Sequence, residues 1–373
     1  MRVFQGACLA LAAILSAAPG RSNDGVYFMS GNQLVPVAET EIAIARERLT
    51  LLRDGDFLDV TVDYTFDNPG PARVLTLGFE AIRPDGDVET DPVAGGHPYM
   101  RAFSVTMNGA ALDHQVALVA GEVYATDGQV RGHGAAEFGE WGPDLYVYHF
   151  QAPFVPGRNR ILHRYRFDLS ATVYSERQFD YVLTAANRWG GAGIGQFELE
   201  IDMGDMAEFQ IAPTFFGGPS DWQILGQGRA FDAPDYYISY GGEFGSGAGF
   251  AIREGRLRFR AAGFRPAGEL YLWVPNLASY RANSYDIEAP PFDAARHPLP
   301  FNLVVNLPEQ AVDSFSARVL RNYPFARRGY VFRDARLGAY FASLPWYLPD
   351  PGYRPDLEAL SETERALYRR MAD

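Results

Sequence analysis

The stretch LDVTVDYTFDNPG, residues 58–70, decides the fold class. Apolar and polar side chains alternate along it with a period of two, which is typical of a β-strand with one buried face and one wet face. The Asn-Pro-Gly turn sequence at 68–70 then ends the strand. The face expected to be buried carries Leu58, Val60, Val62, Tyr64 and Phe66.

The same alternation recurs on both sides of this stretch, and Gly, Pro, Asn and Asp separate the segments. The clearest examples are EIAIARERLTLL (41–52), ARVLTLGFE (72–80), DLYVYHF (144–150), RILHRYRFDL (160–169), GQFELEID (195–202) and ELYLWVP (269–275). No strong helical period lies among them, so the sequence predicts a mainly β protein with a β-sandwich-like antiparallel body. In the first segment, Ile42 and Ile44 are out of phase with Leu49 and Leu51, which predicts a β-bulge near Arg46.

Towards the C-terminus, the period-two pattern gives way first to a proline-rich stretch and then to helix signals. Prolines crowd residues 285–312, which predicts a linker, because proline restricts the backbone and cannot donate to a strand ladder. Beyond it, Asp313, Asp334 and the SETE sequence at 361–364 are N-cap signals for three short helices, with an interruption expected at Pro324 and a left-handed stop at Gly329. The predicted division is therefore a signal peptide at 1–22, a β-rich domain at 24–284, the linker, and a small all-α module at 313–373.

The N-terminus predicts export. Arg2 precedes an apolar run from about Gly6 to Ala18, and small residues follow, which is typical of a secretory signal peptide cleaved after Gly20 or Ser22. The run is too short for a membrane span, so the mature protein is expected not to span a membrane. Cys8, the only cysteine, lies inside this run, so neither disulfides nor thiolate catalysis are expected.

The composition excludes several functions. The basic residues are all arginine, so chemistry that needs a lysine, such as Schiff bases or a Walker A loop, is excluded. A net charge of −13 argues against nucleic acid as a partner, because that needs clustered positive charge. The segment 313–373 holds ten Arg against eight Asp or Glu and is thus +2, so the rest of the chain carries −15.

The stretch LRNYPFARRGYVFRDARLGAYFASLPWY, residues 320–347, resembles the YARHG domain, a small module of bacterial exported proteins named for a Tyr-Ala-Arg-His-Gly core. Phe325 stands where that core has Tyr, and Arg328 where it has His. The resemblance implies an extracytoplasmic binding or structural role. The matching positions are Arg321, Asn322, Ala326, Arg327, Gly329, Tyr330, Phe332, Leu337, Tyr340, Phe341, Trp346 and Tyr347.

The β-rich part also shows a resemblance, carried by IAIARERLTL, VTVDYTFDNP and YVLTAANRWGGAGIGQFELEID, the last at residues 181–202. These stretches are similar to a family of secreted bacterial proteins known as a domain of unknown function, which often precedes a YARHG tail. The resemblance supports the β fold and implies no substrate.

The remaining motifs in the sequence predict neither a cofactor nor a bound metal. The six histidines form no HExxH sequence and no close pair, so none is predicted to bind zinc. The acidic stretch Asp85–Asp91 lacks the glycine and the glutamate of a calcium loop, since Thr90 and Gly96 stand at those places, and a solvated loop is the expected reading. WGGAGIG, residues 189–195, lacks the dinucleotide spacing, and its glycines are expected to let Trp189 pack closely.

The candidate site lies in the predicted helical module. Its planar guanidinium groups and aromatic rings suit sugar rings or the carboxylates of a cell-wall peptide. The alternative reading makes the aromatic residues the core of a small module, with Arg327 as a buried strut. The candidate binding residues are Arg327, Arg328, Tyr330, Trp346 and Tyr347.

The sequence thus predicts an exported, non-enzymatic binding or structural protein of the bacterial cell envelope, periplasmic or extracellular, that contacts wall glycan or peptide. The alternative is a glycan-directed hydrolase with a carboxylate pair in the β-rich domain.

Overall fold

The computed structural model describes residues 24–30, 33–37, 39, 41–82, 96–119, 122–124, 130–132, 145–169, 175–237, 244–275, 291–296, 298–302 and 310–371. The expected signal peptide at 1–22 and the acidic stretch Asp85–Asp91 lie outside these residues.

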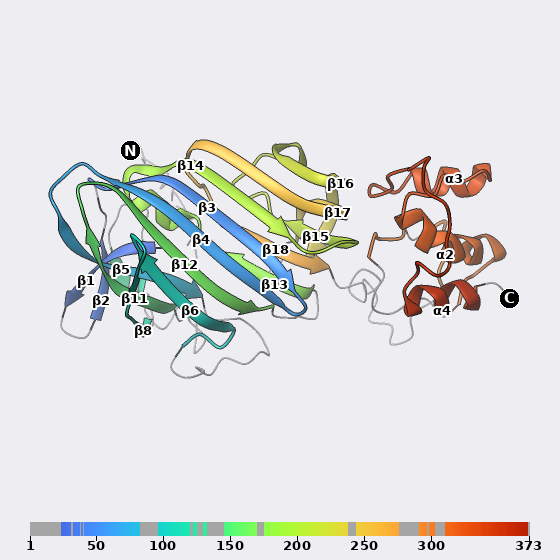
Figure 1. The fold of residues 1–373 in the computed structure, drawn as a ribbon. Coiled ribbons are helices and arrows are strands. Elements are labelled where there is room, and N and C mark those ends of the chain that lie inside the picture. The colour runs from blue at the N-terminus through green and yellow to red at the C-terminus, as the bar shows by residue number, and fades with distance from the viewer. Residues whose placement is uncertain are drawn as a thin grey trace, which may run out of the picture.

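Two sheets pack face to face around one core, which confirms the predicted mainly β, sandwich-like body (Figure 1). The smaller sheet has five strands in the order β2 (Gln33–Val37), β1 (Asp24–Ser30), β5 (Arg73–Ile82), β11 (Leu145–Phe154) and β8 (His114–Val119). A separate two-stranded ribbon pairs β9 (Glu122–Tyr124) with β10 (Val130–Gly132).

The larger sheet has eleven strands and runs the length of the body. Its order is β13 (Ser175–Tyr181), β18 (Leu270–Pro275), β15 (Ala207–Ile211), β17 (Phe244–Phe264), β14 (Gly190–Asp202), β3 (Ala43–Asp54), β4 (Phe57–Asn68), β12 (Gly157–Asp168), β6 (Met100–Met107) and β7 (Ala110–Leu112), while β16 (Trp222–Tyr237) pairs with β17. Its pairs are antiparallel except that β14 runs parallel to β3, so the predicted antiparallel body contains one parallel pair.

Strand β4 confirms the alternation that predicted the fold. Its five apolar side chains, from Leu58 to Phe66, are 0–1% exposed, while their neighbours are partly exposed. Burying such a side chain stabilises the fold by ~1.5–3 kcal/mol, so an alternating strand is held with one face inward. The strand ends as predicted, because the Oδ1 of Asn68 accepts the backbone N–H of Gly70 at 3.1 Å.

The predicted bulge is also confirmed, since the register between β3 and β4 shifts between Ile44 and Arg46. One of the glycines after Trp189 is required by close packing between strands as well as by a turn. A Cβ at Gly195 would lie 2.6 Å from the carbonyl oxygen of Ala45, so only glycine lets β14 pass this close to β3. Trp189 is 2% exposed and packs on Phe66 with ring centroids 4.6 Å apart, as predicted.

The helices lie at one end of the larger sheet, beyond β15, β16 and β17 (Figure 1). They are α2 (Ser314–Arg327), α3 (Ala335–Ala342) and α4 (Glu362–Arg370), and two short 3₁₀ helices, η2 (Thr184–Arg188) and η3 (Pro219–Asp221), lie within the body. No helix in the described part of the chain is long and apolar enough to cross a membrane.

The helices share their core with residues outside 313–373. Phe292, Leu299 and Phe301, which the sequence assigns to the linker, are 2–4% exposed and belong to the same apolar cluster as Trp346. Within residues 291–296 and 298–302, which the structure describes, no helix or strand forms, but the apolar side chains pack inward. These residues therefore contribute to the core of the helices. Ala251 of β17 belongs to this cluster too, so the core continues onto the sheet.

Candidate functional site

The N-terminus of each helix is fixed by the side chain that the sequence predicted. The Oδ1 of Asp313 accepts the backbone N–H of Ser316 at 2.7 Å, and that of Asp334 accepts the N–H of Leu337 at 3.0 Å. Ser361 and Glu364 form a complete capping box at the start of α4. Each cap satisfies backbone donors that a helix otherwise leaves without partners.

The restart of the helix expected at Pro324 does not occur, because α2 is one helix from Ser314 to Arg327 with Pro324 inside it. The kink expected as the other outcome stays a prediction. A proline in a helix interior removes one hydrogen bond, and here the helix ends within one turn, so little regular structure is lost. Gly329 then stops the chain as predicted, with a φ of 90° and its N–H donating to the carbonyl of Ala326 at 2.9 Å.

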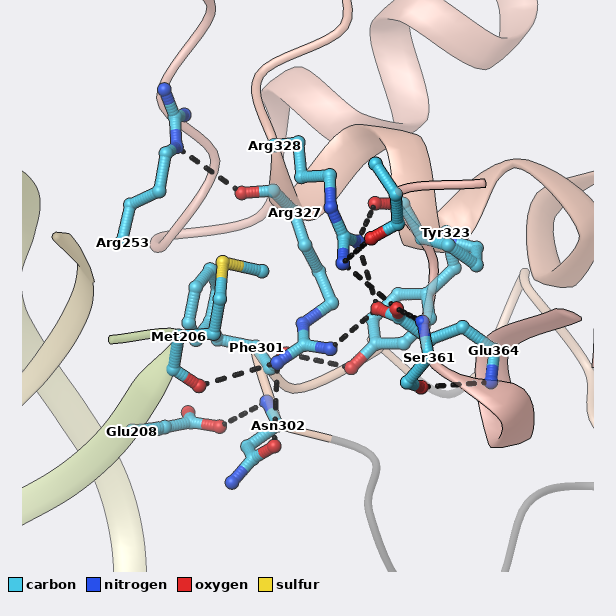
Figure 2. Close-up of polar contacts among 12 residues, drawn as sticks. Met206, Glu208, Arg253, Phe301, Asn302, Tyr323, Arg327, Arg328, Ser361 and Glu364 are labelled. Carbon is cyan, nitrogen blue, oxygen red and sulfur yellow. Dashed lines mark hydrogen bonds and ion pairs between the residues drawn. The ribbon is translucent and has the colours of Figure 1, made fainter. Parts of the chain in front are cut away.

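The end of α2 brings two adjacent arginines onto one carboxylate (Figure 2). The Nη1 of Arg327 lies 2.9 Å from the Oε1 of Glu364, while Arg328 reaches both carboxylate oxygens at 2.8 Å. Burial opposes ionisation of Glu364, but the hydrogen bonds from Arg328 and from the N–H of Ser361, with the charge of Arg327, outweigh it, so its pKa lies below the ordinary value.

Arg327 is the strut between the helices and the sheet. Its guanidinium is stacked near the rings of Phe301 and Tyr323, at 5.0 and 5.6 Å from their centroids. Nη2 donates to the backbone oxygen of Met206, just before β15, at 3.3 Å. The alternative to a ligand contact was a buried arginine bonded to carbonyls at a helix end, and Arg327 is buried, but its side chain bonds to the carbonyl of Met206 before a strand and to the carboxylate of Glu364.

The remaining candidate residues divide into core and surface. Trp346 is 3% exposed and donates from Nε1 to the carbonyl of Leu299 at 2.6 Å, and Tyr347 is 7% exposed with its hydroxyl on the carbonyl of Tyr330. Arg328 and Tyr330 are partly exposed. All five candidate residues lie in the helical module, but only Arg328 and Tyr330 present part of their side chains to solvent.

Two arginines of the body reach across the junction to backbone carbonyls of the module. Arg253, on β17, donates from Nη2 to the carbonyl of Leu348 and from Nε to that of Arg327 at 3.3 Å. Arg229, on β16, donates to the carbonyl of Tyr347 at 3.0 Å. Arg253 also lies 4.0 Å from the carboxylate of Asp350. Because the hydrogen bonds across the junction go to backbone oxygens, they depend on the exact path of the chain after α2 and α3.

Glu208 of β15 completes the junction, and sequence reasoning missed it (Figure 2). Its side chain is 3% exposed, and one oxygen accepts the backbone N–H of Asn302 at 2.7 Å. Burial raises its pKa to about 7, although the N–H groups of Asn302 and Phe301 and the charge of Arg327 partly offset the effect. Period-two alternation places Glu208 on the polar face of β15, the face of a strand that is ordinarily exposed to water.

Outside this junction, we looked for a metal site and for buried polar side chains without a partner. Among the residues that the structure describes, no group of three or more His, Cys, Asp and Glu is placed to hold a metal ion. Next to Glu208 on the same face of β15, Gln210 is 0% exposed, and neither atom of its amide has a hydrogen-bond partner in the described part. Its cross-strand neighbour Trp273 likewise lacks a partner for Nε1 there.

The segment that holds these helices was compared with known protein families. Residues 307–373 match the YARHG domain. The resemblance seen in the sequence is thereby confirmed, and the YARHG match includes α2, α3 and α4. No curated protein matches the chain.

Two of the solved structures that match are both bacterial proteins. A candidate nutrient-binding protein from Legionella pneumophila is 17% identical with a TM-score of 0.44, over 90% of this chain and 95% of that one. An M1 zinc metallopeptidase from Deinococcus radiodurans is 9% identical with a TM-score of 0.25, over 64% of this chain. This chain spans 43% of the peptidase.

Proposed function

We propose that the protein is an exported binding or structural component of the bacterial cell envelope, and that it acts without catalysis. Export is supported by the signal-like N-terminal sequence and by the YARHG domain, a module of exported proteins. The single observation that carries the proposal is the joint between body and module. A continuous apolar cluster and arginines directed at backbone carbonyls hold the two parts in one orientation, which suits a protein that presents a fixed surface to a partner.

Contact with wall glycan or peptide is proposed for the partly exposed side of the YARHG domain. Three of the five candidate residues are buried, so the contact falls to Arg328 and Tyr330. The ring of Tyr330 packs edge-on against Phe332, with centroids 4.9 Å apart, which fixes its orientation. A fixed aromatic ring offers a stacking surface for a sugar, while the guanidinium of Arg328 is held by the carboxylate of Glu364 and the carbonyls of Pro324 and Ala359.

Co-sedimentation of the mature protein with purified peptidoglycan sacculi tests this proposal. We expect retention of the intact protein and loss of retention in Tyr330→Ala, with an unchanged unfolding midpoint. Val331→Ala is the matched control, because Val331 is the exposed neighbour and carries neither a ring nor a charge. No retention of the intact protein would reject wall binding, and release of soluble muropeptides would favour the hydrolase instead.

A further inference from the structure

Glu208 lies where the two parts of the protein meet. It stands on β15, opposite Ala251 of β17, and Ala251 belongs to the apolar cluster of the helical module. One carboxyl oxygen is held by the backbone N–H of Asn302, which belongs to the segment that packs under the helices. If the module leaves the sheet, this carboxyl group therefore passes from an apolar interior to water.

The charged groups around Glu208 are engaged elsewhere. On the same face of the sheet, Arg229 and Arg253 donate to the carbonyls of Tyr347 and Leu348. From the helices, Arg327 is ion-paired with Glu364, which also binds Arg328. Among the described residues of α2, Tyr323 is also titratable, and its hydroxyl donates to the carbonyl of Phe301 at 2.6 Å. Burying a carboxylate without an arginine of its own disfavours the ionised form.

We propose that protonation of Glu208 holds the helical module on the end of the sheet, so that the joint loosens as the pH around the protein rises. For an exported protein, the pH that acts on this joint is the pH outside the cytoplasm. This proposal rests on the proposed export but not on any ligand. The pH dependence of docking can therefore be observed even if the protein does not bind the cell wall.

The direction follows from the two protonation states. With the module docked, burial raises the pKa of Glu208 from 4.5 to about 7. Below pH 4.5 the proton is bound whether the module is docked or not. Between pH 4.5 and 7 only the docked state keeps it, so docking weakens as the pH rises, and above pH 7 no further change occurs. Between pH 5 and pH 8 the docking equilibrium constant is expected to fall by on the order of 100-fold.

Amide hydrogen exchange of the full-length mature protein, compared with Glu208→Gln at pH 5 and pH 8, tests this inference. Glutamine keeps the size and an acceptor for the N–H of Asn302 but cannot ionise. Comparing the two proteins at each pH removes the effect of pH on the chemical exchange rate. We expect protection of the Phe301 and Asn302 amides, which are bonded to Glu208 across the joint, to fall between pH 5 and pH 8 by on the order of 100-fold in the wild type relative to the variant, while strands β3 and β4 change equally in both.

Equal amide protection in the wild type and in Glu208→Gln at both pH values would overturn the proposal. Should the variant fold poorly, infrared spectroscopy of the wild type gives an independent reading. A protonated buried carboxyl band at pH 6 that disappears by pH 8 is expected. An ionised carboxylate throughout this range would also overturn the proposal.

Discussion

Arg327 and Glu364 meet inside the YARHG domain, with 2.9 Å between Nη1 and Oε1 and with side chains only 8% and 10% exposed. They join the last residue of α2 to the first turn of α4. A cation at a helix C-terminus and an anion at a helix N-terminus each favour the backbone dipole, so the pair stabilises both helices as well as joining them. Arg328 shares the same carboxylate, so one acidic group balances two cations.

Glu364→Gln is therefore expected to be strongly destabilising. The amide keeps the shape of the side chain but leaves the two arginines without a counter-charge, and breaking a buried ion pair in this way costs ~3–5 kcal/mol. Chemical denaturation of the wild type and the variant measures the difference. Glu362→Gln is the matched control on the same turn, and because Glu362 is exposed we expect a change within ~0.5 kcal/mol.

The same glutamate also predicts how acid affects the module. Its pKa in the folded protein lies below the ordinary value, so the stabilisation is complete above pH 4.5 and is lost as the pH falls through the folded pKa. Loss of the Glu364 charge thus weakens the module as the pH falls below 4.5, whereas ionisation of Glu208 weakens its docking towards neutral pH. Equal acid sensitivity of wild type and Glu364→Gln below pH 4.5 would contradict the first of these effects.

The sequence predicted the parts of this arrangement that depend on local chemistry. Alternation along β4 and the caps at Asp313, Asp334 and Ser361 each act within a few residues, so their patterns are readable from the sequence. The restart expected at Pro324 was wrong because a proline there removes one hydrogen bond of the helix, and burial of its neighbours outweighs that loss. The joint could not be predicted, because Glu208 follows the same alternation as a residue exposed to water, and only the docking of a distant segment buries it.

Gly329→Ala is expected to damage the joint. Gly329 has a φ of 90°, and a Cβ there would lie 2.7 Å from Nη2 of Arg253 and 2.8 Å from the carbonyl oxygen of Leu348. The added methyl group strains the turn and displaces the arginine that crosses to the sheet, at a cost of ~1–3 kcal/mol. Gly338→Ala is the control, because its Cβ would meet only ordinary contacts at 3.7 Å inside α3. Thermal unfolding should show a gain of ~0.5–1 kcal/mol there.

Trp346 is predicted to be a structural residue rather than a ligand platform. It is 3% exposed, its ring packs against Phe301 and Tyr323, and its N–H is bonded to the carbonyl of Leu299. Trp346→Ala is expected to cost ~3–5 kcal/mol through the cavity it leaves. Trp346→Phe keeps most of the ring and loses the hydrogen bond, so ~1–3 kcal/mol is expected. Near-ultraviolet circular dichroism during melting measures both, and an unchanged midpoint in Trp346→Ala would place the ring outside the core.

Gln210→Leu is expected to leave the protein as stable as the wild type or more stable by ~1–2 kcal/mol. Gln210 lies between Trp273 on β18 and Gly249 on β17, fully buried, and its amide has no partner among the described residues. An unpaired buried amide costs ~1–3 kcal/mol, which leucine of similar size removes.

Gln223→Leu on β16 is the control for Gln210→Leu, because its exposed side chain gains nothing from the same change. Equilibrium denaturation of the two variants separates the outcomes. A loss of more than ~1 kcal/mol in Gln210→Leu alone would contradict the prediction and show that water or a bound group satisfies this amide in solution.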